Sequence, residues 1–246
     1  MLVTQAEVPV EKWSVPAQAV ALVMPDTGME RVARVGRVRG PLLVAMACAV
    51  LAAAAGIVRI DARDATLRML ETQGQLTNSS DRQIEDATKA AERVYMVKRV
   101  GTALVAPPVQ LGLLCVALLA LSWFLRGRSQ GRAIAAVAAA VLIPGAVADL
   151  LEAGATLQRA SVAPEGLAIL PRTLADFWAA AAGHPLMGPA ARLLSAVDVF
   201  SLWGALLAGF GLAAAAQLPA RRALIATLVA WMCYRLLATV AMGGHP

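Results

Sequence analysis

The sequence predicts an all-α fold, a polytopic membrane protein whose five transmembrane helices form a bundle. Five long apolar stretches follow one another along the 246 residues. Hydrophobic residues make up 59% of the chain and charged residues only 15%, which is too apolar for a typical soluble domain. Most of the stretches reach the roughly 20 residues that a helix needs to cross a hydrocarbon layer about 30 Å thick. They are Pro41–Val58, Val100–Leu125, Ala133–Ala148, Val199–Leu218 and Ala223–Met242.

Residues 1–40 are predicted to form a flexible cytoplasmic tail that ends in a basic cluster. Prolines recur along the first 30 residues, and no helical period of apolar residues is sustained there. Within the stretch 41–58, Leu42–Gly56 resembles the apolar region of a secretory signal peptide, with an Ala-x-Ala-like end. Because roughly 40 residues precede it, far more than the charged start of an ordinary signal peptide, we interpret it as the first transmembrane helix. The basic cluster consists of Arg31, Arg34, Arg37 and Arg39.

An amphipathic helix is predicted within residues 59–99, in a loop on the outer side of the membrane. Ser80 and Gln83 have the spacing of a capping box, and apolar residues follow at helical intervals. Pro107-Pro108 is expected to break this helix away from the second transmembrane helix, because proline removes a backbone hydrogen bond and clashes with the preceding turn.

Residues 100–242 are predicted to hold the other four transmembrane helices. Pro144-Gly145 is expected to kink the third of them. Leu174–Ala182 is expected to lie on the outer membrane surface with Phe177 and Trp178 in the interface. Gly188-Pro189 is expected to open the helix that leads into the fourth. Small residues four apart on the fourth helix permit close helix approach, so the chain is a candidate for oligomerisation through this helix. This spacing relates Gly204 to Ala208, Ala205 to Gly209 and Leu207 to Gly211.

The charges between the apolar stretches predict the orientation of the chain. Arginines without any acid occupy the two short connections, at Arg126, Arg128 and Arg132 and at Arg221 and Arg222. The longer segments are mixed: residues 59–99 carry eight basic and seven acidic side chains, and residues 149–198 carry three and five. Because arginine-rich loops stay in the cytoplasm, the N-terminus is predicted inside and the C-terminus outside. The composition, rich in Ala and Arg and poor in Lys, indicates a bacterial inner membrane.

Four charged residues are predicted to meet in the outer half of the membrane. Asp149 and Glu152 lie near the end of the third helix, Asp198 at the start of the fourth and Arg235 within the fifth. An unpaired charge at that depth costs at least about 2.5–3.5 kcal/mol. We therefore expect a polar cluster in which Arg235 pairs with Asp198 or with the two acids of the third helix. The alternative is that each side chain extends separately to the interface.

The stretch 197–211 contains an Asp, a Val-Phe pair, a Trp and an apolar run that ends in Gly, followed by a short basic turn. It resembles the fourth-helix motif of the Yip-domain family, the Rab/Ypt-interacting multispan membrane proteins and their bacterial relatives. Five helices and a cytoplasmic N-terminus are what this resemblance implies. The Asp-Leu-Tyr-Gly-Pro motif of the eukaryotic members is missing, so the resemblance is to the bacterial branch and does not bring Rab binding with it. The matching residues are Asp198, Phe200, Trp203 and Gly211.

The residue inventory favours a protein without catalysis, metal or cofactor. The cysteines Cys48, Cys115 and Cys233 all fall in apolar stretches, and only two histidines are present. A nucleic-acid partner is not expected, because aromatic residues make up only 4% of the chain and no binding motif occurs.

Three functions are compatible with this inventory. The preferred hypothesis is a non-enzymatic membrane scaffold or adaptor with the lipid bilayer and protein partners around it. The first alternative is a permease or an auxiliary subunit of an exporter. The second is an intramembrane enzyme, which is disfavoured because Ser122 and Ser201 have no His or Lys near them in the spans.

Overall fold

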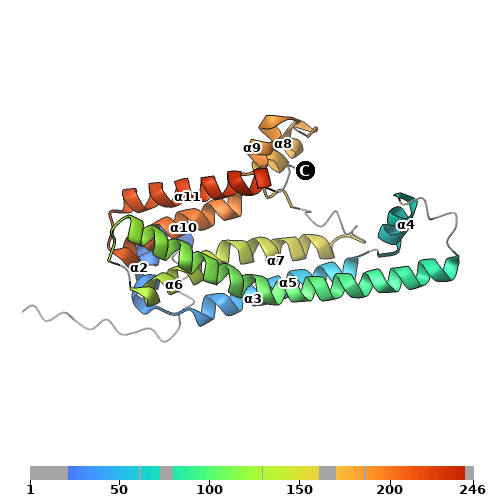
Figure 1. Cartoon of the computed structure of the whole chain (residues 1–246), viewed down its shortest axis with the longest axis horizontal. Coiled ribbons are helices and arrows are strands. Elements are labelled where there is room, and N and C mark those ends of the chain that lie inside the picture. The colour runs from blue at the N-terminus through green and yellow to red at the C-terminus, as the bar shows by residue number, and fades with distance from the viewer. Residues whose placement is uncertain are drawn as a thin grey trace, which may run out of the picture.

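The structure is a computed structural model that describes residues 22–60, 62–72, 80–128, 130–160, 170–185 and 187–241. In these residues the chain forms helices and no β-sheet, which confirms the all-α class (Figure 1). Residues 1–21 of the predicted tail and the end of the fifth apolar stretch lie outside this part. The helices are α2 (Pro25–Val35), α3 (Arg39–Arg59), α4 (Ala62–Thr72), α5 (Asp81–Phe124), α6 (Gly131–Val141), α7 (Ile143–Leu157), α8 (Leu174–Ala182), α9 (Pro189–Ser195), α10 (Val199–Ala216) and α11 (Ala220–Ala241).

Four helical segments among the described residues are long and apolar enough to cross a membrane. They are Arg39–Arg59, Asp81–Phe124, Gly131–Leu157 and Val199–Ala216, and they cover the first four predicted stretches. A membrane-embedded protein is thereby indicated. The helix α11 occupies the fifth predicted stretch with 22 residues but is not among the four, so the fifth crossing stays a prediction.

The core of the bundle is formed where α10 packs against α2, α6 and α11. Ile134 and Val137 of α6 and Leu212 of α10 are fully buried there. Alanine dominates the rest of this apolar core, which brings the helix backbones close together. The helices α3 and α7 lie side by side next to it, and α5 runs along α3 (Figure 1).

A helix occupies residues 25–35, where the sequence predicted a flexible tail. Pro25 stands in its first turn, and Gly36 ends it with a φ of 63°. Met29 and Val32 lie one turn apart and are buried against α6 and α10. The flexible-tail prediction is therefore wrong for α2, because its apolar side packs against α6 and α10, which are distant in sequence.

The helix α5 continues through Pro107 and Pro108, so the predicted break between an outer helix and the second span is wrong. The ribbon bends partway along α5 but does not stop (Figure 1). Membrane helices tolerate proline where local adjustment or neighbouring protein compensates for the lost backbone hydrogen bonds. The start of α5 was predicted correctly. The Ser80 hydroxyl accepts a hydrogen bond from the Gln83 amide, and the Gln83 side chain accepts one from the Ser80 amide.

The third span is interrupted, as the Pro144-Gly145 pair predicted. α6 ends at Val141 and α7 begins at Ile143, one residue before the proline. The amide of Leu142 bonds to the carbonyl of Ala139, which is the tighter three-residue turn typical of a helix end. The break divides this span into α6, in which most of residues 133–140 are buried, and α7, which carries Asp149 and Glu152.

The small residues of α10 are buried in contacts with other helices of the same chain. A Cβ at Gly209 would lie 2.8 Å from Cδ2 and 3.0 Å from Cα of Leu224 on α11. A Cβ at Gly211 would lie 2.6 Å from Cε of Met29 and still closer to Val137. At both positions the shortest of these distances is below any ordinary carbon contact, so a larger residue would have to displace its neighbours. Binding of a second copy through α10 would therefore need its other residues.

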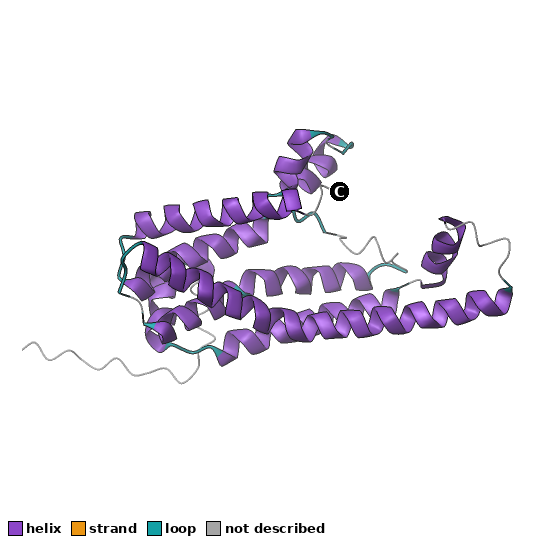
Figure 2. Ribbon diagram, in the orientation of Figure 1, coloured by secondary structure: helices purple, strands orange, loops and turns teal. Residues whose placement is uncertain are grey.

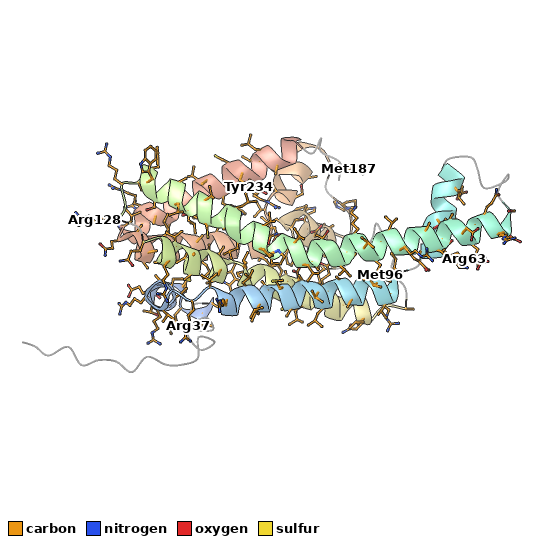
Figure 3. The ribbon with its side chains drawn as sticks, turned by 60° about the horizontal axis from the view of Figure 1, so that its bottom comes forward. Arg37, Arg63, Met96, Arg128, Met187 and Tyr234 are labelled. Atoms are coloured by element: carbon orange, nitrogen blue, oxygen red, sulfur yellow. The ribbon has the colours of Figure 1, made fainter. Side chains whose placement is uncertain are left out.

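The connections between the spans gather at two opposite ends of the bundle (Figure 2). One end, which we call the arginine face, holds Arg37 and Arg128, whereas Arg63 lies at the other (Figure 3). A hydrogen bond of 2.9 Å from the amide of Arg128 to the carbonyl of Ala216 joins two of the three arginine-rich segments. The segments predicted to share one side of the membrane thus share one end of the structure.

Candidate functional site

Charged residues meet at the far end of α7, away from the arginine face. Asp149 and Glu152 are three residues apart and so lie on one side of the helix. Arg172, which precedes α8, brings its guanidinium to both: Nη2 lies 3.5 Å from Oδ1 of Asp149 and also donates to Oε2 of Glu152. The three side chains are largely shielded, and that of Glu152 is only 18% exposed. Each carboxylate therefore has a cationic partner.

Backbone pairing fixes the position of Arg172. The amide of Val199 donates to the carbonyl of Arg172, and the amide of Leu174 donates to the carbonyl of Val197, both at 3.0 Å. Thr173 then caps α8 through a capping box with Asp176, so α8 has the predicted bounds 174–182. The starts of α8 and α10 are consequently tied together, and Arg172 is held where it reaches α7.

Asp198 and Arg235 lie at the same junction. Asp198 caps α10: its Oδ1 accepts hydrogen bonds from the amides of Phe200 and Ser201 at 2.8 and 3.2 Å. Arg235 of α11 donates from Nε to the carbonyl of Ala196 at 2.7 Å. The four predicted residues and Arg172 thus surround the junction of α7, α8, α10 and α11. We call Asp149, Glu152, Arg172, Asp198 and Arg235 the polar junction.

The depth of the two acids follows from the neighbouring helix. Arg59, the last residue of α3, donates from Nη2 to the carbonyl of Leu157 at 3.0 Å, so the ends of α3 and α7 are level. Glu152 and Asp149 lie five and eight residues before Leu157, or about 8 and 12 Å along the helix. They therefore lie beside the apolar part of α3, where a carboxylate without a partner is costly.

Arg172 is the residue that sequence reasoning missed. It belongs to a connecting segment, and no periodicity relates it to α7, 20 residues or more away in sequence. The one local signal is the capping box that follows it, which marks the start of α8 and hence a fixed entry point. Arg235 was expected to pair with Asp198 or with Asp149 and Glu152. The ion pairs of Asp149 and Glu152 are instead with Arg172.

The residues of the resemblance motif have clear structural positions. Asp198 is the N-cap of α10, and Trp203 packs against the apolar core. Gly211 permits the contact with Met29 and Val137. Phe200 is partly buried in the first turn. Each position is explained by the packing of α10 alone, so the motif by itself does not mark a binding site.

Catalytic or metal-binding groups are not evident in the described part of the chain. No group of three His, Cys, Asp or Glu residues there has the geometry to hold a metal ion. Ser201 donates to the carbonyl of Asp198, and Ser122 is fully buried next to Gly127. Two carboxylates that share one guanidinium give the polar junction two possible roles. The closed ion pairs hold three helices together, and opened pairs would free the carboxylates to bind a cation or a proton.

Comparison of the chain with protein-family models, with curated proteins and with solved structures gives no significant match to any of the three.

Proposed function

We propose that this protein is a non-enzymatic scaffold or adaptor of the bacterial inner membrane that crosses the bilayer five times. Its N-terminus is cytoplasmic and its C-terminus lies on the opposite side. The gathering of the arginine-rich segments at one end supports this orientation, because basic segments stay in the cytoplasm. The end that holds the polar junction then faces outward.

The fifth crossing is proposed from the pairing of α11 with α10. The two helices run antiparallel after a turn at residues 217–219, and Gly209 brings their backbones close. A helix of 22 residues is about 33 Å long, which is enough for a hydrocarbon layer of about 30 Å. Because α11 lies alongside a candidate span, it occupies the same layer.

The observation that carries the scaffold proposal is the apolar filling of the bundle between its two charged ends. The core residues between the arginine face and the polar junction are mainly Ala, Val, Leu and Ile, packed around α6 and α10. Rings of backbone carbonyls or of charged side chains select the solute in a membrane pathway, and no such ring lies in this core among the described residues. Asp149 and Glu152, which lie inward from the end of α7, are paired with Arg172, whereas Asp198 and Arg235 bond to backbone groups. Packing of this kind suits a rigid platform.

The helix α5, the longest of the described helices, forms one outer surface of the platform. Val105 and Val116 are 59% and 67% exposed, and neighbouring positions along the same side are exposed as well. Lipid covers such a surface at no cost, and a partner helix fits it equally well. We therefore assign partner binding to α5. We retain membership of the bacterial branch of the Yip-like family as part of the proposal, on the sequence motif of Asp198, Phe200, Trp203 and Gly211.

Site-specific photo-crosslinking in native membranes tests the adaptor proposal. A photoreactive residue at Val105 or Val116 is expected to give one discrete protein adduct, identified by mass spectrometry. The same residue at Val137, which is fully buried in the chain, is the control and is expected to give none. If only lipid adducts form along α5, the adaptor proposal is contradicted.

One observation favours the alternative, a permease or an exporter subunit. The third span is broken at Leu142, just before the acids Asp149 and Glu152, and broken helices beside charged residues recur at transport sites. A proton or ion flux in reconstituted vesicles that disappears in Glu152→Gln would support the permease. Flux indistinguishable from empty vesicles supports the scaffold.

A further inference from the structure

Nine arginines and two acids lie in the segments that form the arginine face. Both acids belong to α2, where Glu30 pairs with Arg34 at 3.3 Å. The segments 126–132 and 217–222 contain no acid at all. The face is therefore strongly positive. Its arginines are Arg31, Arg34, Arg37, Arg39, Arg126, Arg128, Arg132, Arg221 and Arg222.

The fold collects these residues from three distant parts of the chain. Arg132 donates from Nε to the carbonyl of Gly36 at 3.4 Å, which joins α6 to the end of α2. The amide of Arg128 donates to the carbonyl of Ala216, which joins the same connection to the end of α10. Gly127 fits against Ala216, where a Cβ would be 2.8 Å away. The arginines thus form one built surface rather than three separate loops.

Two large aromatic rings lie directly beside this surface. Trp123 and Phe124, in the last turn of α5, are 82% and 75% exposed, and Arg126 and Arg128 follow within four residues of Phe124. Aromatic rings in this position are typical of the level of the lipid headgroups. The rings are an observation independent of the charge, and they indicate contact with lipid on the same side of the bundle.

We infer that the arginine face binds the phosphate headgroups of anionic phospholipids, with Trp123 and Phe124 against the upper acyl chains. A guanidinium matches a phosphate with two parallel hydrogen bonds, and basic residues at a membrane surface each favour anionic lipid by about fivefold. Steering topology requires only a charge bias, whereas this surface concentrates its charge at one place beside an apolar anchor. The inference rests on the proposed membrane location and adds a lipid class to it.

Quenching of Trp123 by brominated lipids tests the inference. The other tryptophans are replaced by Phe, and the protein is reconstituted in phosphatidylcholine vesicles that contain a minor fraction of brominated lipid. Brominated phosphatidylglycerol is expected to quench Trp123 about fivefold more strongly than brominated phosphatidylcholine at equal fraction. The variant Arg126→Gln/Arg128→Gln is expected to bring this ratio close to one. The matched control, Arg82→Gln/Arg93→Gln on the far end of α5, is expected to leave it unchanged.

The outcomes separate the two claims. Equal quenching by both lipids in the parent protein overturns the lipid preference while leaving the membrane location intact. Absence of quenching by either lipid contradicts the membrane location itself. Because removal of Trp203 from the core can impair folding, the count of retained phosphatidylglycerol molecules is also measured by native mass spectrometry with all tryptophans present. A count that does not fall in Arg126→Gln/Arg128→Gln also overturns the inference.

Discussion

The helices α10 and α5 are both apolar enough to cross a membrane, yet they are used in opposite ways. Inside the chain, 56% of the apolar window of α10 is buried, whereas only 11% of that of α5 is buried. The buried residues of α10 are mostly Gly and Ala, and the large apolar residues exposed on α5 are mainly Val and Leu. In lipid the apolar side chains gain nothing by leaving the surface, so helices associate where small residues permit close contact. Side-chain size, rather than hydrophobicity, separates the centre of this bundle from its periphery.

The strongest test of this difference is to place the same bulk on both helices. Gly211→Leu on α10 is expected to lower the free energy of unfolding by about 3 kcal/mol, because the new side chain overlaps Met29 and Val137. Gly112→Leu on α5 is expected to change it by less than about 0.5 kcal/mol, because nothing lies within 4 Å of its Cβ position. Unfolding by SDS in mixed micelles measures both. Equal losses would show that α5 is also packed.

A second test concerns the charges that tie the start of α10 to α7. Arg172→Ala leaves Asp149 and Glu152 without the guanidinium, and we expect a loss of about 2 kcal/mol, since the groups are partly exposed. The triple variant with Asp149→Asn and Glu152→Gln is expected to recover most of the loss. Arg93→Ala, on the exposed end of α5, is the control and is expected to have little effect. Failure of the triple variant to recover stability would contradict the pairing.

The smallest effect is expected from the helix caps. Asp198→Ala removes two hydrogen bonds at the start of α10 and is expected to cost about 1 kcal/mol of global stability. Ser80→Ala removes the cap of α5, where the helix extends beyond its neighbours, and is expected to cause local fraying only (Figure 1). Hydrogen exchange with mass spectrometry distinguishes the two, because only Asp198→Ala should increase exchange throughout α10 and α11. Fraying confined to residues 198–202 in Asp198→Ala would show that α10 is no more central than α5.

The local features of the fold were open to prediction from short stretches of sequence. The capping box at Ser80, the break before Pro144 and the helix 174–182 depend on neighbours a few residues apart, and all three are found. The tail helix α2 and the passage of α5 through Pro107 were mispredicted. Both depend on what surrounds the segment. The helices α6 and α10 cover Met29 of α2, and the surroundings of α5 tolerate the loss of the backbone hydrogen bonds that the two prolines cannot make.

The polar junction shows the same limit at the level of single residues. Asp149, Glu152, Asp198 and Arg235 were identified because a charge inside an apolar stretch or next to its end is conspicuous. Arg172 was not, because it stands in a connecting segment where a charge is ordinary.

What the sequence alone determines about this protein is its class: apolar stretches long enough to cross lipid, arginine-rich connections that alternate with connections of mixed charge, and helix starts marked by capping residues. These properties depend on composition and on spacing along the chain, so they can be recognised without knowing which segments pack together. The tertiary structure decides which side of each helix is covered, which cation meets Asp149 and Glu152, and that three arginine-rich segments make one surface. The reason is physical: these contacts join residues up to about 100 positions apart, and chain closure over such lengths is set by the packing of the whole bundle.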